Sequence, residues 1–124
     1  MSTRAILVVD DDRLIRESLA DILDDLGATT AQAEDGLQAL EMVISSPPDM
    51  VISDIDMPDI SGFELLARMH RQTITIPLLL MSARADDNLR HQAELAGAIG
   101  LLDKPVGVRP LASMLHSALN WPSF

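Results

Sequence analysis

The sequence contains no cysteine and no tyrosine, and aromatic side chains make up 2% of its 124 residues. The lack of cysteine excludes disulfides, cysteine-ligated metals and thiol catalysis, and it agrees with a reducing compartment. No run approaches the roughly 20 apolar residues of a membrane-spanning helix, and the N-terminus lacks the pattern of a signal peptide. We therefore expect a soluble, cytoplasmic protein that does not enter a membrane.

Positive charge is also scarce. Nine basic residues stand against 19 acidic ones, which gives a formal net charge of −10. Direct binding of nucleic acid needs a basic surface that displaces phosphate counterions, so we do not expect it here. The excess of acid is compatible with a divalent cation site. Lys104 is the single lysine beside eight arginines, which favours a role that needs a compact point charge rather than a planar fork.

Apolar side chains are abundant, at 48% of the chain, and they form short runs that alternate with amphipathic segments. The runs predict strands over residues 4–9, 28–33, 50–53, 76–81 and 98–102, each followed by a helix. In the second helix, Leu37, Leu40 and Ile44 are expected on one face. Five strand–helix units with short connections predict one domain over residues 1–124, with a parallel sheet covered by helices on both faces.

Four of the apolar runs are followed directly by a charged or hydroxyl-bearing side chain. The first is followed by Asp10 and Asp11, the third by Asp54, the fourth by Ser82 and the fifth by Lys104. In open parallel sheets, ligands bind at the carboxyl ends of the strands, near the switch in strand order. We therefore expect these residues to form one cluster at that edge of the sheet.

Three carboxylates in one cluster repel one another, and either raised pKa values or a cation must relieve the repulsion. Oxygen ligands without histidine or cysteine nearby favour Mg²⁺. A metal ion, a lysine and a hydroxyl around a carboxylate are suited to phosphoryl transfer. Asp54 is then the candidate nucleophile, Lys104 and the metal neutralise the phosphoryl oxygens, and Ser82 donates a hydrogen bond to one of them.

Four motifs in this order resemble the receiver domain of two-component response regulators. They are Ile6–Asp12, Asp54–Gly62, Met81–Ala83, and the stretch from Ala96-Gly97-Ala98 to Lys104-Pro105. The resemblance covers essentially the whole chain. It implies a flavodoxin-like α/β fold, a three-layer sandwich whose five parallel strands have the order 2-1-3-4-5.

The resemblance also implies roles for individual residues. Asp54 takes a phosphoryl group from a phosphohistidine on a histidine kinase or histidine phosphotransfer protein. Mg²⁺ is held by Asp11, by Asp54 and by the backbone carbonyl of Asp56, while Asp10 acts through a water molecule. A downstream protein or an output domain then responds to the phosphorylated state.

At the fifth strand, the resemblance implies that Lys104 pairs with the phosphoryl group and that its bond to Pro105 is cis. The family usually places an aromatic residue shortly before this lysine, where the chain has Leu101. We therefore expect a muted or different change on the surface made by the fourth helix, fifth strand and fifth helix. Asp56 and Arg84 occupy the two positions that flank the site entrance in the family. We expect them to lie close together and to modulate loss of the phosphoryl group.

An exposed apolar surface is expected beside the acidic cluster. Leu14 is out of phase with the apolar stripe of the first helix, and Pro105 and Val106 lie nearby. These three residues predict a docking surface for the helical bundle that carries the donor histidine. Residues 120–124 are interpreted as a C-terminal tail that caps the last helix, or as the start of a linker.

Two other functions remain open at this stage. One is a pseudo-receiver that binds proteins without using phosphate, for which the missing aromatic residue leaves room. The other is a Mg²⁺-dependent phosphohydrolase with an aspartyl nucleophile, suggested by Asp54-Ile55-Asp56 but disfavoured by the order of the motifs. A receiver domain catalyses its own phosphorylation and slow dephosphorylation and accumulates as a stoichiometric phosphoprotein, whereas a hydrolase turns over small phosphate esters. Whether the chain stands alone or is part of a larger protein is also left open.

Overall fold

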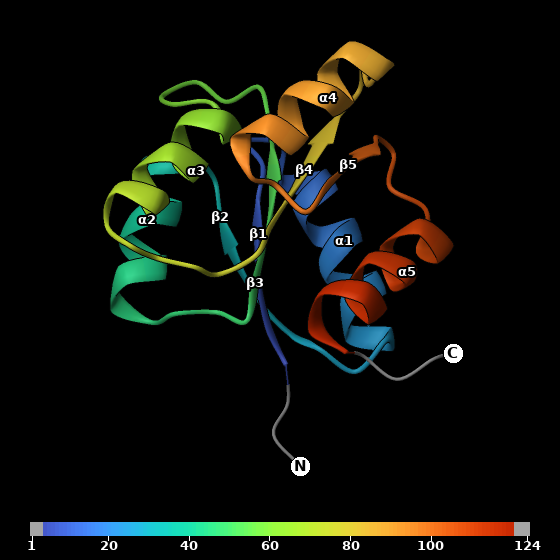
Figure 1. Ribbon diagram of the computed structural model, residues 1–124. Helices are drawn as coiled ribbons and strands as arrows, with labels where there is room; N and C mark the ends of the chain where they lie inside the picture. The colour runs from blue at the N-terminus through green and yellow to red at the C-terminus, as the bar shows by residue number, and fades with distance from the viewer. Residues whose placement is uncertain (1–3, 121–124) are drawn as a thin grey trace.

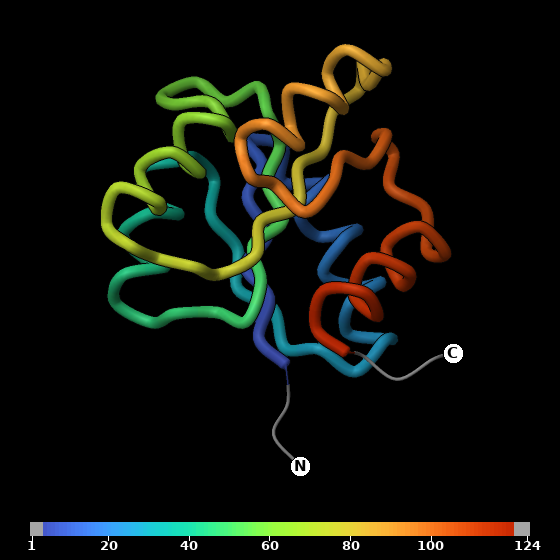
Figure 2. Tube along the Cα trace, in the orientation of Figure 1, coloured from blue at the N-terminus to red at the C-terminus, as the bar shows by residue number. Residues whose placement is uncertain are grey.

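Five strands alternate with five helices along residues 4–120, the part of the chain that the computed structural model describes. The strands are β1 (Ala5–Val9), β2 (Thr29–Ala33), β3 (Met50–Asp54), β4 (Leu78–Ser82) and β5 (Gly100–Asp103). The helices are α1 (Arg13–Asp25), α2 (Gly36–Ser45), α3 (Gly62–Arg71), α4 (Asp87–Ala96) and α5 (Val108–Leu119). All pairings are parallel and the strand order is β2-β1-β3-β4-β5, as the resemblance implied. Figure 2 shows the chain passing from each strand through a helix to the next strand.

The sheet is covered on both faces. Helices α1 and α5 lie on one face, and α2, α3 and α4 lie on the other (Figure 1). Alternate residues of β1 enter the two cores: Ile6 and Val8 pack beneath α1 and α5, whereas Leu7 and Val9 pack beneath the other three helices. A strand that is buried on both faces needs apolar residues at every position. This is why the strands appear in the sequence as continuous apolar runs.

The strands differ in burial according to their place in the sheet. Every residue of β3 and of β4 is buried, whereas most of the edge strand β2 is exposed or half-buried. The central strands therefore carry Asp54 and Ser82 at their carboxyl ends within a rigid, close-packed frame. Strand β2 contributes no side chain to the cluster predicted from the sequence.

Four helices begin on a side chain that accepts an amide hydrogen bond from the first turn. The capping residues and their donors are Asp12 with Leu14, Asp35 with Gln38, Ser61 with Glu64, and Asp86 with Leu89. Such caps satisfy amides that have no partner inside the helix. They stabilise the helix starts that follow β1, β2, β3 and β4 at the carboxyl edge of the sheet.

Of the three residues expected on one face of α2, Leu40 packs against the core, whereas Leu37 and Ile44 do not. Leu37 and Ile44 are 47% and 53% exposed, while Ala39 and Val43 are buried. Gly36 contacts the side chain of Ile60 so closely that no Cβ fits there. The small residues of α2 thus lie in the core, Leu40 and Met42 pack against it, and Leu37 and Ile44 are largely exposed.

The limits of two strands also differ from the prediction. Strand β4 begins at Leu78 rather than at residue 76, directly after Pro77, which has no amide hydrogen for the ladder. Strand β5 begins at Gly100 rather than at residue 98 and extends to Asp103. The role predicted for residues 121–124 falls outside the described part of the chain.

Candidate functional site

The four marked strand ends meet at the carboxyl edge of the sheet. Asp10 follows β1, Asp54 ends β3, Ser82 ends β4 and Lys104 follows β5. The amide of Lys104 donates to the carbonyl of Ser82 at 2.9 Å, so the strand pairing continues into the loop. Parallel pairing thus delivers residues from four distant parts of the sequence to one place.

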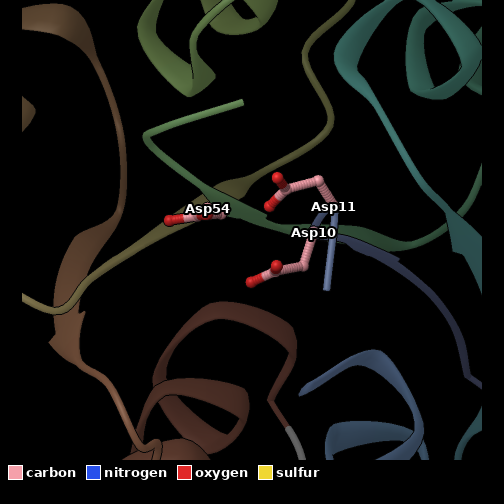
Figure 3. A group of neighbouring side chains, drawn as sticks. All are labelled: Asp10, Asp11 and Asp54. Carbon is pink, nitrogen blue, oxygen red and sulfur yellow. The ribbon is translucent and has the colours of Figure 1, made fainter. Parts of the chain in front are cut away.

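Three carboxylates form the centre of the cluster. One ligand atom from each of Asp10, Asp11 and Asp54 lies within 4.8 Å of the others. Figure 3 shows the three side chains close together where the neighbouring strands β1 and β3 end. Asp10 is fully buried and Asp54 is 5% exposed, whereas Asp11 is open to solvent. The cluster is therefore closed towards the sheet and open on the side of Asp11.

Lys104 lies between the two buried carboxylates. Its Nζ is 2.8 Å from Oδ2 of Asp10 and 3.3 Å from Oδ2 of Asp54. Burial lowers the pKa of the Lys104 ammonium, but the hydrogen bond and charge of Asp10 and the charge of Asp54 outweigh it, so the net pKa is raised. The lysine therefore remains a cation beside both carboxylates.

The environment of Asp54 raises its pKa. Burial is the largest cause and the nearby charge of Asp10 adds to it, while Lys104 and the amide of Asp56 act in the opposite direction. Burial and a like charge both disfavour the ionised carboxylate. Asp54 is thus held in an unfavourable state that a cation or a covalent change would relieve.

Both carboxylate oxygens of Asp10 are already in use. Oδ1 accepts the amide of Asp12 at 2.8 Å, and Oδ2 accepts Nζ of Lys104. The guanidinium of Arg16 also donates to the backbone carbonyl of Asp10 at 2.7 Å and, through Nε, to Gln32 at 3.2 Å. Sequence analysis missed Arg16. The available signal was its place in the first helix, one turn after Asp12, but helical position alone does not show which loop atom a long side chain reaches.

The hydroxyl of Ser82 is buried at 3% exposure, and its oxygen accepts the amide of Arg84 at 3.0 Å. Accepting this bond leaves the hydroxyl hydrogen as a donor. The side chain of Arg84 reaches Asp56, with Nη2 3.6 Å from Oδ2, as expected from the sequence. Both side chains are largely exposed, at 84% and 70%. They border a depression of about 320 Å³ next to Ser82 and Ile55.

The apolar surface predicted beside the cluster forms a groove of about 430 Å³. Leu14 is 75% exposed and lines this groove together with Pro105 and Val106. Ile15, Ser18 and Leu19 of α1 complete one wall, and Lys104 lies at its end. The bond between Lys104 and Pro105 is cis, as the resemblance implied. The groove therefore leads from α1 to the cation of the cluster.

The side chain of Leu101 in β5 lies on the face of the sheet opposite to this groove. It is 8% exposed and belongs to the core beneath α2, α3 and α4, where Leu80 and Ala93 also pack. Leu89 and Ala98 pack against the same core. The position expected for a switching aromatic residue is therefore filled by a buried aliphatic side chain.

Known proteins share this sequence pattern and this fold. Residues 6–116 match the model of the response regulator receiver domain. The chain is 39% identical over 120 residues to response regulator MprA of Mycobacterium ulcerans, covering 97% of this chain and 51% of the relative. It therefore spans about half the length of the curated relatives that it matches.

Solved structures show the same likeness. Chemotaxis protein CheY4 of Vibrio cholerae has a TM-score of 0.84 and 30% identity, covering 94% of this chain and 99% of that chain. A putative response regulator from Chloroflexus aurantiacus has a TM-score of 0.89 and 30% identity, with 96% and 99% covered. These are similarities across nearly the whole of the present chain.

Proposed function

The chain belongs to the receiver domain family of two-component response regulators, and on this basis we propose that Asp54 is its phosphoacceptor. The observation that supports this proposal most directly is the pairing of a buried carboxylate with a single lysine. Lys104 lies 3.3 Å from Asp54. Asp54 ends β3 and Lys104 follows β5, with β4 between these two strands in the sheet. A phosphoryl group on Asp54 would meet this cation at once.

In the proposed reaction, a carboxylate oxygen of Asp54 attacks the phosphorus of a phosphohistidine on a histidine kinase or phosphotransfer protein. The bond between phosphorus and the imidazole nitrogen breaks, and its electron pair stays with the imidazole. Lys104 turns from Asp10 towards the new phosphoryl oxygens and offsets their charge. The hydroxyl of Ser82 donates to one of these oxygens.

The donor set of the cluster fits Mg²⁺. Its side-chain ligands are carboxylate oxygens alone, and the groups lie within 4.8 Å of one another. We assign Asp11, Asp54 and the backbone carbonyl of Asp56 as direct ligands. Asp10 acts through water, which agrees with the engagement of both its oxygens by Asp12 and Lys104. When bound, the metal ion supplies charge neutralisation at the transferring phosphoryl group.

We propose that the groove next to Lys104 receives the partner that carries the donor histidine. Leu14, Pro105 and Val106 offer an apolar contact directly beside the phosphoacceptor. A bundle helix laid in this groove would bring its histidine to the open side of the cluster. Because the curated relatives are about twice as long as this chain, an output domain or a separate downstream protein is the proposed recipient of the signal.

A cytoplasmic location is part of the proposal. Among residues 4–120, no helix has both the length and the apolar character needed to cross a membrane. The net charge of −10 supports protein partners rather than direct contact with nucleic acid.

The proposed response at Leu101 differs from that of a receiver with an aromatic switch. Leu101 already occupies a buried site, so no ring is available to move inwards when Ser82 engages the phosphoryl group. We expect small changes on the surface of α4, β5 and α5. Amide chemical shifts with and without beryllofluoride as a phosphoryl mimic test this, and large shifts across the whole surface would contradict it.

The phosphoacceptor is tested by incubating the protein with acetyl phosphate and Mg²⁺ and measuring its intact mass. We expect one added phosphoryl group in the wild type, none in Asp54→Asn, and none when EDTA removes the metal. Asp24→Asn, which removes an exposed acid from the last turn of α1, at the opposite end of the helix from Asp12, serves as the matched control and should be phosphorylated normally. Phosphorylation that persists in Asp54→Asn would place the acceptor elsewhere, and multiple turnover of the ester would favour a hydrolase.

A further inference from the structure

Asp59 connects the loop after β3 to a distant helix. Its Oδ1 accepts the amide of Gly36 at 3.0 Å, and its Oδ2 accepts the amide of Leu37 at 2.7 Å. These donors lie 23 and 22 residues earlier in the chain and belong to the first turn of α2. Amides of a first helical turn have no partner inside the helix. The exposed carboxylate of Asp59 thus links its own loop to the first turn of α2 by two hydrogen bonds.

Helix α2 does not depend on Asp59 for its own cap. Asp35 precedes the helix and accepts the amide of Gln38 at 2.8 Å, and the side chain of Gln38 accepts the amide of Glu34 at 2.7 Å. This reciprocal arrangement resembles a capping box. The contribution specific to Asp59 is therefore to hold the loop against α2, in addition to any support it gives the helix.

Two further contacts fasten the same loop. Ile60 packs on Gly36, where no Cβ would fit, and the amide of Gly62 donates to the carbonyl of Ile55 at 2.9 Å. A Cβ on Gly62 would lie 2.6 Å from the carbonyl oxygen of Asp54. The loop is thus fixed to β3 at one end and to α2 near the other. In Figure 2 the loop and the turn before α2 lie at the same end of the molecule.

Asp56 lies between these two attachments. Its amide donates to the carboxylate of Asp54, while its own side chain is exposed and pairs with the guanidinium of Arg84 at 3.6 Å. An exposed ion pair of this kind holds a backbone weakly. The placement of the Asp56 backbone therefore depends on the attachments of the loop.

We propose that Asp59 is a positioning residue of the phosphoacceptor site, which fastens the loop to α2 and thereby holds the backbone of Asp56 beside Asp54. The part of this inference that concerns metal binding rests on the proposed function, in which the carbonyl of Asp56 is a ligand. The edge strand β2 gains an indirect role, because the turn that follows it provides the anchor. The negative charge of Asp59 also lies at the positive end of the α2 dipole, which favours this contact.

The test compares Asp59→Ala and Asp59→Asn with the control Asp35→Ala. The control removes an acceptor from the same helix end but leaves the contact between loop and helix intact. Two quantities are measured in each protein: the Mg²⁺ dissociation constant by calorimetry, and the hydrogen exchange rate of the Asp56 amide in metal-free protein. The first reports on the metal ligand set, and the second reports on the loop alone.

We expect Asp59→Ala to bind Mg²⁺ about 10-fold more weakly and Asp35→Ala to change by less than about 2-fold, as for the loss of an outer partner of a metal ligand. The Asp56 amide should exchange faster in Asp59→Ala than in the wild type. Asp59→Asn should give intermediate values, because its single carbonyl oxygen replaces only one of the two acceptors.

Two results would overturn the proposal. One is wild-type exchange of the Asp56 amide in Asp59→Ala, which would show that the loop does not need this contact. The other is an equal effect in Asp35→Ala, which would assign the whole change to fraying of α2. If the wild-type protein bound no Mg²⁺, the proposed metal site would fail, while the exchange rates in metal-free protein would still decide the role of Asp59.

Discussion

Asp54 lies just before the loop between β3 and α3, and Asp59 lies near the end of that loop. Their surroundings nevertheless shift their pKa values in opposite directions. Burial and the charge of Asp10 raise the pKa of Asp54. Burial would also raise the pKa of Asp59, but the amides of Leu37, Ile60 and Gly36 together outweigh it and lower that pKa. One residue type thus serves two purposes. At Asp54 the ionised state costs free energy, and at Asp59 it stabilises the fold.

The difference shows that solvent exposure alone does not predict which acid is structurally important. Asp59 is exposed, but its two amide partners give it a defined position. Asp54 is buried, and the stabilisation of its charge by Lys104 and by the Asp56 amide is outweighed by burial and by the like charge of Asp10. The proposed phosphoacceptor thus carries a charge that its surroundings disfavour, whereas the residue proposed to position its loop carries a charge that hydrogen bonds stabilise.

The largest expected effect concerns the cation that separates Asp10 from Asp54. Replacing Lys104 with methionine should lower the free energy of unfolding by about 3 kcal/mol at neutral pH, because it leaves a buried carboxylate without its partner. The loss should shrink in acid, where the carboxylates become neutral. Urea unfolding followed by circular dichroism measures this in metal-free protein.

Arg90→Met is the matched control for this experiment. Arg90 pairs with Asp103 at 3.2 Å, and both side chains are well exposed. Its loss should cost about 0–1 kcal/mol. Equal effects in the two variants would contradict the view that Lys104 compensates a buried charge.

The second effect concerns Asp54 itself. Because its pKa is raised in the folded state, the stability linked to its proton is present below the unfolded pKa near 4 and is lost as pH rises through the folded pKa. Asp54→Asn removes this loss. We expect it to raise the free energy of unfolding by about 0.5–2 kcal/mol at neutral pH in metal-free protein.

The gain for Asp54→Asn should disappear near about pH 3, where the wild-type carboxyl is neutral as well. Unfolding curves at several pH values in EDTA provide the measurement. A variant that is less stable than the wild type at neutral pH would show that Asp54 contributes more through its hydrogen bonds than it costs through its charge.

The opposite pH dependence is expected for Asp59. Its lowered pKa means that its contribution is complete above the unfolded pKa and is lost as pH falls through the folded pKa. Asp59→Ala should cost about 1 kcal/mol at neutral pH, the usual size for losing an acceptor at a helix start, and almost nothing in strong acid. The same unfolding series measures it, and a loss independent of pH would contradict the role of the charge.

The smallest expected effect on stability concerns Asp56, which lies between Asp54 and Asp59 in the loop. Its pair with Arg84 is largely exposed, so Arg84→Ala should change stability by less than about 1 kcal/mol. The expected change is in the rate at which the phosphorylated protein loses its phosphoryl group, since the pair borders the approach to Ser82. Decay of the phosphorylated mass over time measures this rate. An unchanged rate in Arg84→Ala would show that Arg84 does not modulate loss of the phosphoryl group.

Most of the fold was predictable because strands that are buried on both faces appear in the sequence as continuous apolar runs. The grouping of Asp10, Asp54 and Lys104 was predictable for a related reason, since parallel strands place all their carboxyl ends at one edge. The face of α2 was not predictable from periodicity. Gly36 of this helix lies against Ile60, and periodicity does not record a contact between residues so distant in sequence.

Arg16 and Asp59 escaped prediction for the same physical reason. Each acts on the backbone of another segment: Arg16 on the carbonyl of Asp10, and Asp59 on amides of α2. Every residue has a backbone carbonyl and nearly every residue has a backbone amide, so the partner in such a contact cannot be recognised by its residue type. Side chains that bind side chains of opposite charge can be guessed from composition, whereas side chains that bind peptide groups need the structure.

The solitary lysine has a consequence for chemical labelling. Acetyl phosphate transfers acetyl groups to amines as well as phosphoryl groups to carboxylates, and Lys104 is the only side-chain amine in the chain. Its ammonium is held as a cation by Asp10 and Asp54 and is mostly buried, so it is a poor nucleophile in the resting protein. Acetylation and phosphorylation add different masses, and beyond the α-amino group any acetyl adduct belongs to Lys104. Intact mass thus reports the occupancy of the proposed acceptor, and peptide mapping of the same sample locates any acetyl group and reports the accessibility of Lys104.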